Sequence, residues 1–397
     1  MSAAVALLEV GTGEGAAVRA ARVAAIASQH ADAVDIEGRF PREAVDAMRA
    51  EKLLSIQIPA DLGGEGASMT EIAELCSILG QACAASAMVF AMHQIKLSSL
   101  VEHGADSDWH REFMRRIARE QLLLASATTE GGIGGNLRNS ICAIKVEGDT
   151  CTLEKDATVI SYGAHADAIL ITSRSHAEAA SSDQVLTCFL RDQYDIKRTV
   201  EWDTLGMRGT CSDGFLFKGE APAKQILPKP FAEIAAQSML ASSHLLWSGV
   251  WYGIAADAVS RAQAFVRAAA RKSPGAPPPG ALRLAEASSM LQMVKSNVVA
   301  GLKAYEEAKL DADRLSSMAF AVAMNNVKIA SSEMILPIIN HAMLICGIMG
   351  YKNGTPYSLG RHLRDAHSAQ LMISNDRILG NTSTMLLVHK QDSSLLG

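Results

Sequence analysis

Three positions carry side chains that could accept a proton from a substrate in an otherwise apolar setting. Asp376 follows the stretch HSAQLMISN, His244 lies within SMLASSHLLW, and His93 lies within VFAMHQIKL. Carboxylates and imidazoles are common groups in general acid–base catalysis, and imidazole titrates close to neutral pH. Each residue also has a purely structural interpretation: Asp376 could be a solvated helix residue beside Arg377, and His244 a satisfied histidine of the core or of an interface.

The sequence gives less support to a dinucleotide site, a metal site or a nucleic-acid surface. The stretch GGIGGN, at positions 131–136, follows an apolar segment but precedes strands instead of a helix, which argues against a Rossmann dinucleotide site. The 7 cysteines are scattered without a CxxC pair, so neither a metal site nor a disulfide framework is indicated. The net charge of −5 implies no basic face for nucleic acid.

The elements that must position these residues fall into three blocks. Positions 1–124 have helical spacing, 125–227 contain short alternating strands, and 228–397 have the long apolar periodicity of a helix bundle. Within the middle block, Glu147-Gly148-Asp149 predicts a hairpin turn. We therefore expect a mainly α protein with an N-terminal helical domain, a small antiparallel β-domain and a C-terminal four-helix bundle.

The apolar stretches predict no membrane span. The densest of them, from Ile329 to Met349, is interrupted by Ser, Glu, Asn, His and Pro. The N-terminal MSAAVALLEVGTGEG has neither the basic region nor the apolar length of a signal peptide. We expect a cytoplasmic protein with reduced thiols.

Four motifs, in this order, resemble the acyl-CoA dehydrogenase family of flavoproteins. They are FPREAVDAMRAEKLLSIQIPADLGGEGAS, ASATTEGGIGGN, DATVISYGAHADAILI and WDTLGMRGTCSDGFLFKGEAPAKQIL, followed by CGIMGY and GRHLRDA in the C-terminal block. Each motif alone is weak, but together they cover almost the whole chain.

The resemblance implies a reaction and a set of partners. Family members use FAD to dehydrogenate an acyl thioester, carried by coenzyme A or an acyl-carrier protein, to the 2-enoyl form in fatty acid metabolism. Their electrons pass to an electron-transfer flavoprotein or another acceptor. The resemblance also implies a homo-oligomer, either a dimer or a homotetramer, whose flavin sites are completed across subunits.

Residues for the flavin ring follow from the same resemblance. Thr128, Thr129 and Ser161 match positions that contact the ring, and Ile160 precedes Ser161 in that segment. Ser161 replaces the usual Thr and so retains a hydroxyl. Val159 stands where the family usually has a Trp against the flavin, so an aromatic wall is expected to be lost.

Three further positions are implied for the rest of the cofactor. Arg271 matches an Arg that reaches the flavin pyrophosphate of a neighbouring subunit, although the residues after it depart from the family pattern. Gly347 and Gly350 match glycines that let the adenosine half approach the backbone. No metal is implied.

The carboxylate that serves as catalytic base in most of the family is missing. Counting from the RDA motif places Ile373 at its position, and no Glu follows Arg361. If the segment after RDA is one continuous helix, Asp376 lies nearly one turn beyond, about 4.5 Å along the axis. Asp376 is therefore the first candidate base and His244, on the first bundle helix, the second.

Two other functions stay open. Some relatives without the Glu are monooxygenases that use reduced flavin and oxygen, and the loss of both the Glu and the Trp favours that reaction. A non-catalytic subunit of the same fold is the third alternative, and the retained hydroxyls argue against it.

Overall fold

Helices begin and end the described chain, and the strands come between them. The computed structural model describes residues 14–132, 136–272, 275, 277–390 and 394. Part of the GGIGGN stretch, residues 133–135, therefore lies outside the described residues. The first helices are α1 (Ala16–Glu37), α2 (Arg42–Ala50), α3 (Met69–Ala82), α4 (Ala84–His103) and α5 (Asp108–Glu120).

Seven strands in the described part of the chain form two small sheets. They are β1 (Leu124–Ala127), β2 (Lys145–Glu147), β3 (Thr150–Ala157), β4 (Ala168–Arg174), β5 (Gln184–Leu190), β6 (Tyr194–Val200) and β7 (Gly214–Pro222). One sheet has the order β1-β4-β5 and the other β2-β3-β7-β6. The expected hairpin is confirmed, because Glu147 pairs with Thr150 across a turn in which Gly148 has a φ of 59°. One pair, β1 with β4, is parallel, so the β-domain is not wholly antiparallel.

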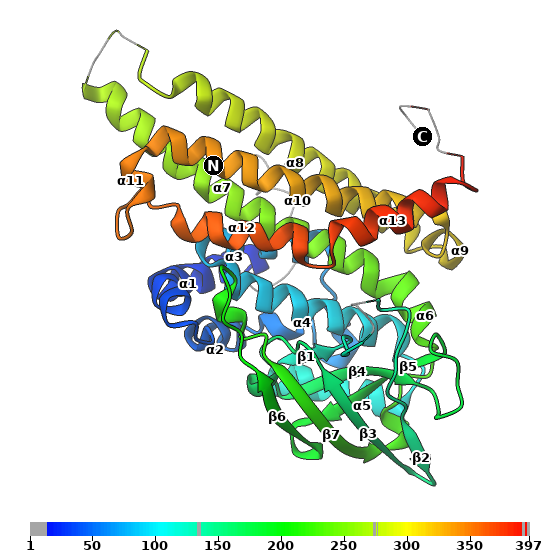
Figure 1. Ribbon diagram of the computed structural model, residues 1–397. Coiled ribbons are helices and arrows are strands. Elements are labelled where there is room, and N and C mark those ends of the chain that lie inside the picture. The colour runs from blue at the N-terminus through cyan, green and yellow to red at the C-terminus, as the bar shows by residue number, and fades with distance from the viewer. Residues whose placement is uncertain (1–13, 133–135, 273–274, 276, 391–393, 395–397) are drawn as a thin grey trace.

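The C-terminal half is a bundle of long helices, as the sequence predicts. Its elements are α6 (Phe231–Ile234), the π-helical turn η8 (Ala235–Met239), α7 (Leu240–Lys272), α8 (Ala281–Ala308), α9 (Ala312–Leu315), α10 (Met318–Cys346), α11 (Ile348–Tyr351), α12 (Gly360–Leu371) and α13 (Asn375–Leu386). In Figure 1 the bundle lies above the two sheets, and α4 runs between them. Because α4 packs against both α7 and β1, it joins the two layers.

Helix α10 is long and apolar enough to cross a membrane by length and composition, which the sequence analysis did not anticipate. It packs against α7, α8, α12 and α13 in the bundle. Polar side chains on it, including Asn325, Lys328 and Ser332, are buried by these neighbours. Its packing is that of a bundle core helix.

The segment after RDA is not one continuous helix, so that expectation is wrong. Helix α12 ends at Leu371 and α13 begins at Asn375, with Ile373 between them at a φ of 45°. Lys328 Nζ donates to the carbonyl oxygen of Ile373 at 3.1 Å and to Asn375 Oδ1 at 2.5 Å. Ser332 also bonds to Asn375 Oδ1. These tertiary bonds from α10 override the helical spacing of the local sequence.

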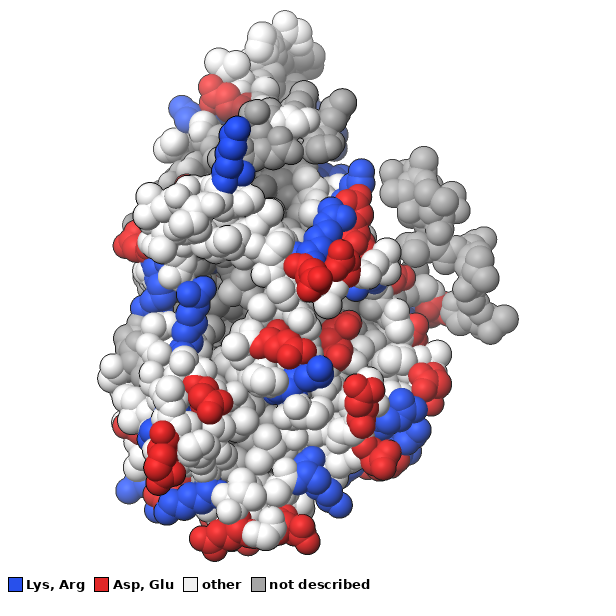
Figure 2. Space-filling model, turned by 90° about the vertical axis from the view of Figure 1, so that its right-hand side faces the viewer, with Lys and Arg blue, Asp and Glu red and all other residues white. Residues whose placement is uncertain are grey.

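Charges of both signs are mixed on the molecular face shown in Figure 2. Lys and Arg alternate with Asp and Glu there, and no area of that face is dominated by basic side chains. This face therefore offers no extended basic surface of the kind that binds a nucleic-acid backbone.

Candidate active site

The principal pocket lies where the loops of the sheets meet α4, α7 and α12. Its volume is about 630 Å³. Its walls carry hydroxyls from the sheet loops, apolar side chains from α4 and α7, and cationic side chains from several helices. The lining includes Lys96, Thr128, Thr129, Ser161, Trp202, Trp247, Arg364, His367, Ile373 and Arg377. No Asp or Glu belongs to the described lining.

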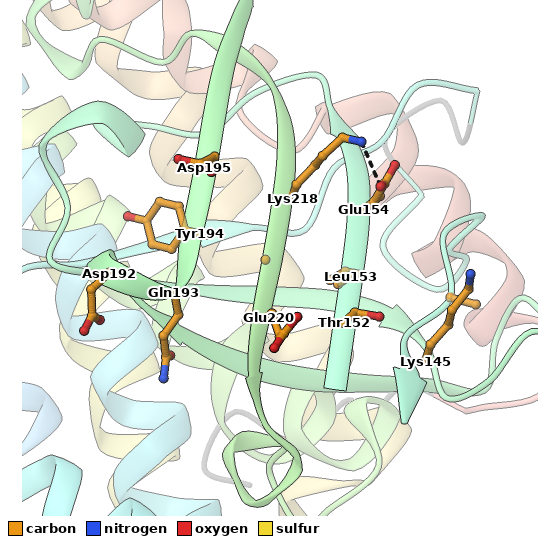
Figure 3. Close-up of a pocket in the computed structure, with 12 residues that line it drawn as sticks. Lys145, Thr152, Leu153, Glu154, Asp192, Gln193, Tyr194, Asp195, Lys218 and Glu220 are labelled. Carbon is orange, nitrogen blue, oxygen red and sulfur yellow. Dashed lines mark hydrogen bonds and ion pairs between the residues drawn. The ribbon is translucent and has the colours of Figure 1, made fainter. Parts of the chain in front are cut away.

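A second hollow of about 770 Å³ lies on the strands β3, β6 and β7 (Figure 3). It is lined by charges of both signs, and its Lys218–Glu154 pair is solvated, with side-chain exposures of 66% and 73%. Such an exposed pair contributes little binding energy. The pocket beside α4, which is enclosed by more apolar residues, is therefore the better candidate for an active site.

The sheet-side wall carries a short chain of hydroxyls. Ser212 Oγ donates to Ser161 Oγ at 2.8 Å, and Thr210 Oγ1 lies 2.8 Å from Ser212 Oγ. Since Ser161 accepts this bond, its own hydroxyl hydrogen is left to donate into the pocket. Thr129 Oγ1 donates to the carbonyl oxygen of Val159 at 3.2 Å. The wall therefore offers both hydrogen-bond donors and acceptors.

An aromatic side chain on this wall was missed by the sequence analysis. Val159 lines the pocket at the position where the family usually has Trp, but Trp202, from the loop after β6, lines the same pocket. Its Nε1 donates to the carbonyl oxygen of Met207 at 3.1 Å, which fixes the indole. The flat apolar surface expected to be lost at Val159 is thus available from another segment.

Helix α12 is tied closely to the sheet loop before η6 (Arg208–Thr210). A Cβ on Gly206 would lie 2.2 Å from the carbonyl oxygen of Arg364, so only Gly allows this approach. Met207 N donates to Asp365 Oδ1 at 2.6 Å, and Arg364 pairs with Asp35 of α1. Burial raises the pKa of Asp365 to about 6. These contacts hold the pocket-lining face of α12 in place.

The opposite wall is formed by two stripes with helical spacing. Met88, Met92 and Lys96 recur every four residues on α4, and Met239, Ser243 and Trp247 do so along η8 and α7. Lys96 Nζ lies 2.9 Å from Met239 Sδ. Burial lowers the pKa of Lys96 to about 7.

The structure places Asp376 away from the pocket. It is exposed in the first turn of α13 and is not among the lining residues, because the break at Ile373 redirects the chain. An acidic residue in a first turn is favoured there by the helix dipole. Ile373 itself lines the pocket. The position counted from RDA therefore faces the pocket, but its side chain is apolar.

The two histidines proposed as alternatives are core residues. His244 is 1% exposed, and neither ring nitrogen has a described hydrogen-bond partner. Burial, with a smaller contribution from the charge on Lys328, lowers the pKa of His244 to about 3. His93 accepts from Leu124 N and donates to the carbonyl oxygen of Leu54, and its pKa is lowered to about 4 by burial. The imidazole that does line the pocket is His367.

The seven cofactor positions separate into groups. Thr128, Thr129 and Ser161 line the pocket, whereas Ile160 is fully buried beside it and donates its N–H to the carbonyl oxygen of Asp213. Arg271 lies at the far end of α7, 24 residues beyond Trp247, which is a rise of about 36 Å.

Gly347 and Gly350 lie at the end of α10 and in α11, outside the pocket lining. In Figure 1 this end of α10 and the end of α7 lie on the same side of the bundle. The pocket of one chain therefore does not bring these three residues to Ser161.

Sequence comparison now places the chain among known proteins. The acyl-CoA dehydrogenase N-terminal domain matches residues 16–143, and the acyl-CoA dehydrogenase C-terminal domain matches residues 234–381. The chain belongs to the acyl-CoA dehydrogenase family. It is an oxidoreductase of the acyl-CoA dehydrogenase type, and the expected fold class is confirmed.

Individual relatives are distant. The cyclohex-1-ene-1-carbonyl-CoA dehydrogenase of Syntrophus aciditrophicus is 24% identical over 87% of this chain and 82% of the relative. The enzyme of that name from Geobacter metallireducens is 25% identical over 49% of this chain, and the match spans about half of the relative, 51%.

A solved structure with the same fold is FMN-bound TdsC from Paenibacillus sp. A11-2, a dibenzothiophene monooxygenase. Its TM-score is 0.82 at 18% identity, and the match covers 95% of this chain and 98% of TdsC. At this identity the likeness establishes the fold alone.

Proposed function

We propose that the chain is a flavin-dependent dehydrogenase that removes one hydrogen from each of the α and β carbons of an acyl thioester to give the 2-enoyl thioester. The observation that carries this proposal is one pocket whose lining suits both a flavin ring and an acyl chain. It combines the hydroxyls of Thr128 and Ser161, the flat side chain of Trp202 and the imidazole of His367 beside a largely apolar channel. An acyl chain needs such a channel, and a flavin ring needs polar groups along one edge.

The sheet-side wall fits a flavin ring. The free hydroxyl hydrogen of Ser161 can donate to a ring acceptor, and Trp202 provides an apolar surface. When bound, the flavin accepts the two electrons that leave the substrate as a hydride. We propose FAD, because Arg271, Gly347 and Gly350 would meet the pyrophosphate and adenosine of a neighbouring subunit's cofactor in a homo-oligomer.

We propose His367 as the proton acceptor. Helix α12 presents Arg364, His367, Ser368 and Leu371 to the pocket, a spacing that lies along one helical face. His367 takes the α-proton at a ring nitrogen, while Arg364 and Asp365 fix the helix through Asp35 and Met207. Asp376 and His244 are not retained for this role, since neither lines the pocket.

The test is anaerobic titration of the flavin-loaded protein with a panel of acyl thioesters. Bleaching of the flavin absorbance is expected, and His367→Gln should slow it by about a hundredfold or more. Ile373→Glu, which introduces a carboxylate at the family position, should restore much of that rate in the His367→Gln background. Bleaching by no thioester would exclude dehydrogenation.

A flavin monooxygenase is the second candidate, and one observation favours it. The described lining contains no carboxylate, and such a group is not required when oxygen is the reactant. TdsC, a monooxygenase, shares the fold. This reaction predicts no anaerobic bleaching by thioesters. It predicts instead oxygen consumption by the pre-reduced protein that is coupled to oxygenation of an added substrate.

A further inference from the structure

An amine without a matching anion lies on the α4 wall of the pocket. Lys96 is 5% exposed, and its one hydrogen-bond acceptor among the described residues is the thioether of Met239. No described carboxylate forms an ion pair with it. A buried ammonium normally requires a charged partner, because its removal from water is strongly unfavourable. Core packing alone would favour an apolar residue here.

A second donor on the same wall is also unmatched. Trp247 is 6% exposed, lines the pocket, and its Nε1 has no acceptor among the described residues. Unpaired buried donors are rare in proteins and indicate a missing acceptor. Both donors therefore indicate that the ligand brings acceptors to this wall.

The spacing of the two donors indicates an elongated ligand. Lys96 Nζ contacts Met239, which precedes Trp247 by eight residues, a rise of about 12 Å. A small inorganic anion would not reach both donors. The methionines along this wall, Met88 and Met92, are side chains that adapt to the shape of an apolar chain.

Exposure distinguishes the inner end of the pocket from its mouth. Leu371 on α12 is 76% exposed, whereas Met239 and Lys96 are each 5% exposed. The π-helical turn η8 ends at Met239, and such turns occur often at functional sites. Lys96 and Met239 therefore lie in the enclosed part of the pocket, away from the mouth beside Leu371.

We propose that Lys96 binds a carboxylate at the distal end of the acyl group, so that the substrates are monothioesters of dicarboxylic acids. Trp247 Nε1 donates to a carbonyl oxygen at another point along the same ligand. One lysine matches the single charge of a carboxylate, whereas a phosphate dianion would require more donors than this end provides. The proposal rests on the proposed dehydrogenase function. Burial supports it, because the attraction between an ammonium and a carboxylate is stronger in a low-dielectric interior than in water.

The experiment compares matched thioesters that differ only in the distal carboxylate. Adipoyl-CoA is paired with hexanoyl-CoA, and suberoyl-CoA with octanoyl-CoA, in flavin-loaded wild type, Lys96→Met and Lys96→Arg. Dissociation constants from calorimetry are measured together with anaerobic flavin reduction. The surface variant Lys303→Met, which removes the same charge on α8 at 79% side-chain exposure, is the control.

Wild type and Lys303→Met should bind the carboxylate member of a pair about 10 to 100 times more tightly, as expected for a buried charged hydrogen bond. Lys96→Met should lose or reverse that preference while still reducing flavin with hexanoyl-CoA or octanoyl-CoA. Lys96→Arg should retain part of the preference.

An unchanged preference in Lys96→Met would overturn the proposal. Loss of flavin reduction with every thioester in that variant would also overturn it, because Lys96 would then be the base. If no thioester reduces flavin in the wild type but the binding preference still depends on Lys96, the dehydrogenase proposal fails and the carboxylate site stands.

Discussion

Two buried lysines in this chain have opposite surroundings. Lys328, beneath the break between α12 and α13, donates to the Ile373 carbonyl and to Asn375, and it lies 5.7 Å from the centre of the Trp251 ring. Lys96, on α4, has the thioether of Met239 as its only hydrogen-bond acceptor among the residues that the structure describes. Burial lowers the pKa of both amines, to about 8 for Lys328 and about 7 for Lys96.

The difference separates a structural role from a binding role. Lys328 holds backbone in an uncommon conformation and needs no further partner. Lys96 is stabilised by little in the chain, so its presence lowers the stability of the free protein. A residue that costs stability at the inner end of a pocket is typical of a functional site.

The largest effect is expected for Lys328→Met. It leaves the Ile373 carbonyl without its buried donor and removes one of the two donors to Asn375 Oδ1, so the free energy of unfolding should fall by about 3 kcal/mol. Urea denaturation measures this change. A loss no greater than that of the surface control Lys303→Met would contradict the structural role of Lys328.

Lys96→Met should change the free energy of unfolding in the opposite direction. Replacing an unpaired buried ammonium with an apolar side chain should raise the free energy of unfolding by about 2 kcal/mol at pH 7. Urea denaturation at the same protein concentration measures it. A decrease in stability would show that Lys96 has a stabilising partner and would remove the contrast.

The gain in Lys96→Met should also depend on pH. The folded pKa of Lys96 is about 7, below its ordinary value of 10.5, so the folded state binds fewer protons in that interval. The wild type therefore loses stability as pH falls from about 10.5 to 7, and the advantage of the variant grows over that range. Below pH 7 the difference should stay constant. If the difference in unfolding free energy between Lys96→Met and the wild type did not change between pH 7 and pH 10, the titration of Lys96 would not be its cause.

A smaller effect is expected for His244, which lies in the field of Lys328. The folded pKa of His244 is about 3, so the wild type loses stability as pH falls through 6.5. His244→Leu should reduce the loss between pH 7 and pH 6 by about 0.7 kcal/mol. Its rate of flavin reduction should match the wild type. A strong loss of that rate would restore His244 as a base candidate.

The smallest effect is expected for Asp376→Asn, next to the Asn375 that Lys328 holds. The side chain is exposed, so stability should change by less than about 0.5 kcal/mol. Flavin reduction by thioesters should stay within about twofold of the wild type, a margin of about 0.4 kcal/mol in the barrier. A drop of a hundredfold would instead place Asp376 in the chemistry.

The sequence predicted the fold and the hydroxyl wall because both depend on local patterns. Helical spacing, the Glu147–Asp149 turn and the position of Ser161 within its motif are readable from neighbouring residues. Lys96 was missed because nothing near it indicates a site. Its contact, Met239, is 143 residues away and is positioned by a π-helical turn.

The predicted continuous helix failed for the same reason. The spacing of Leu371, Asn375 and Ile378 is helical, but Lys328 lies 47 residues from Asn375 and bonds to the chain there. Trp202 was likewise missed: this chain has Val at position 159 in place of the family's Trp, and the aromatic side chain that lines the pocket comes from a different loop. Residues that meet only through tertiary contacts leave no local pattern.

The tie between α12 and the earlier parts of the chain has a consequence for the order of synthesis. Asp35 and Gly206 are translated long before Arg364, their shared neighbour. Until α12 emerges from the ribosome, the loop that contains Gly206 and Met207 has no helix against it, and the part of the pocket lining that α12 supplies is missing. Incompletely folded chains expose apolar surface that favours aggregation. The pocket of the nascent chain is completed only at the end of synthesis, when this risk is also removed.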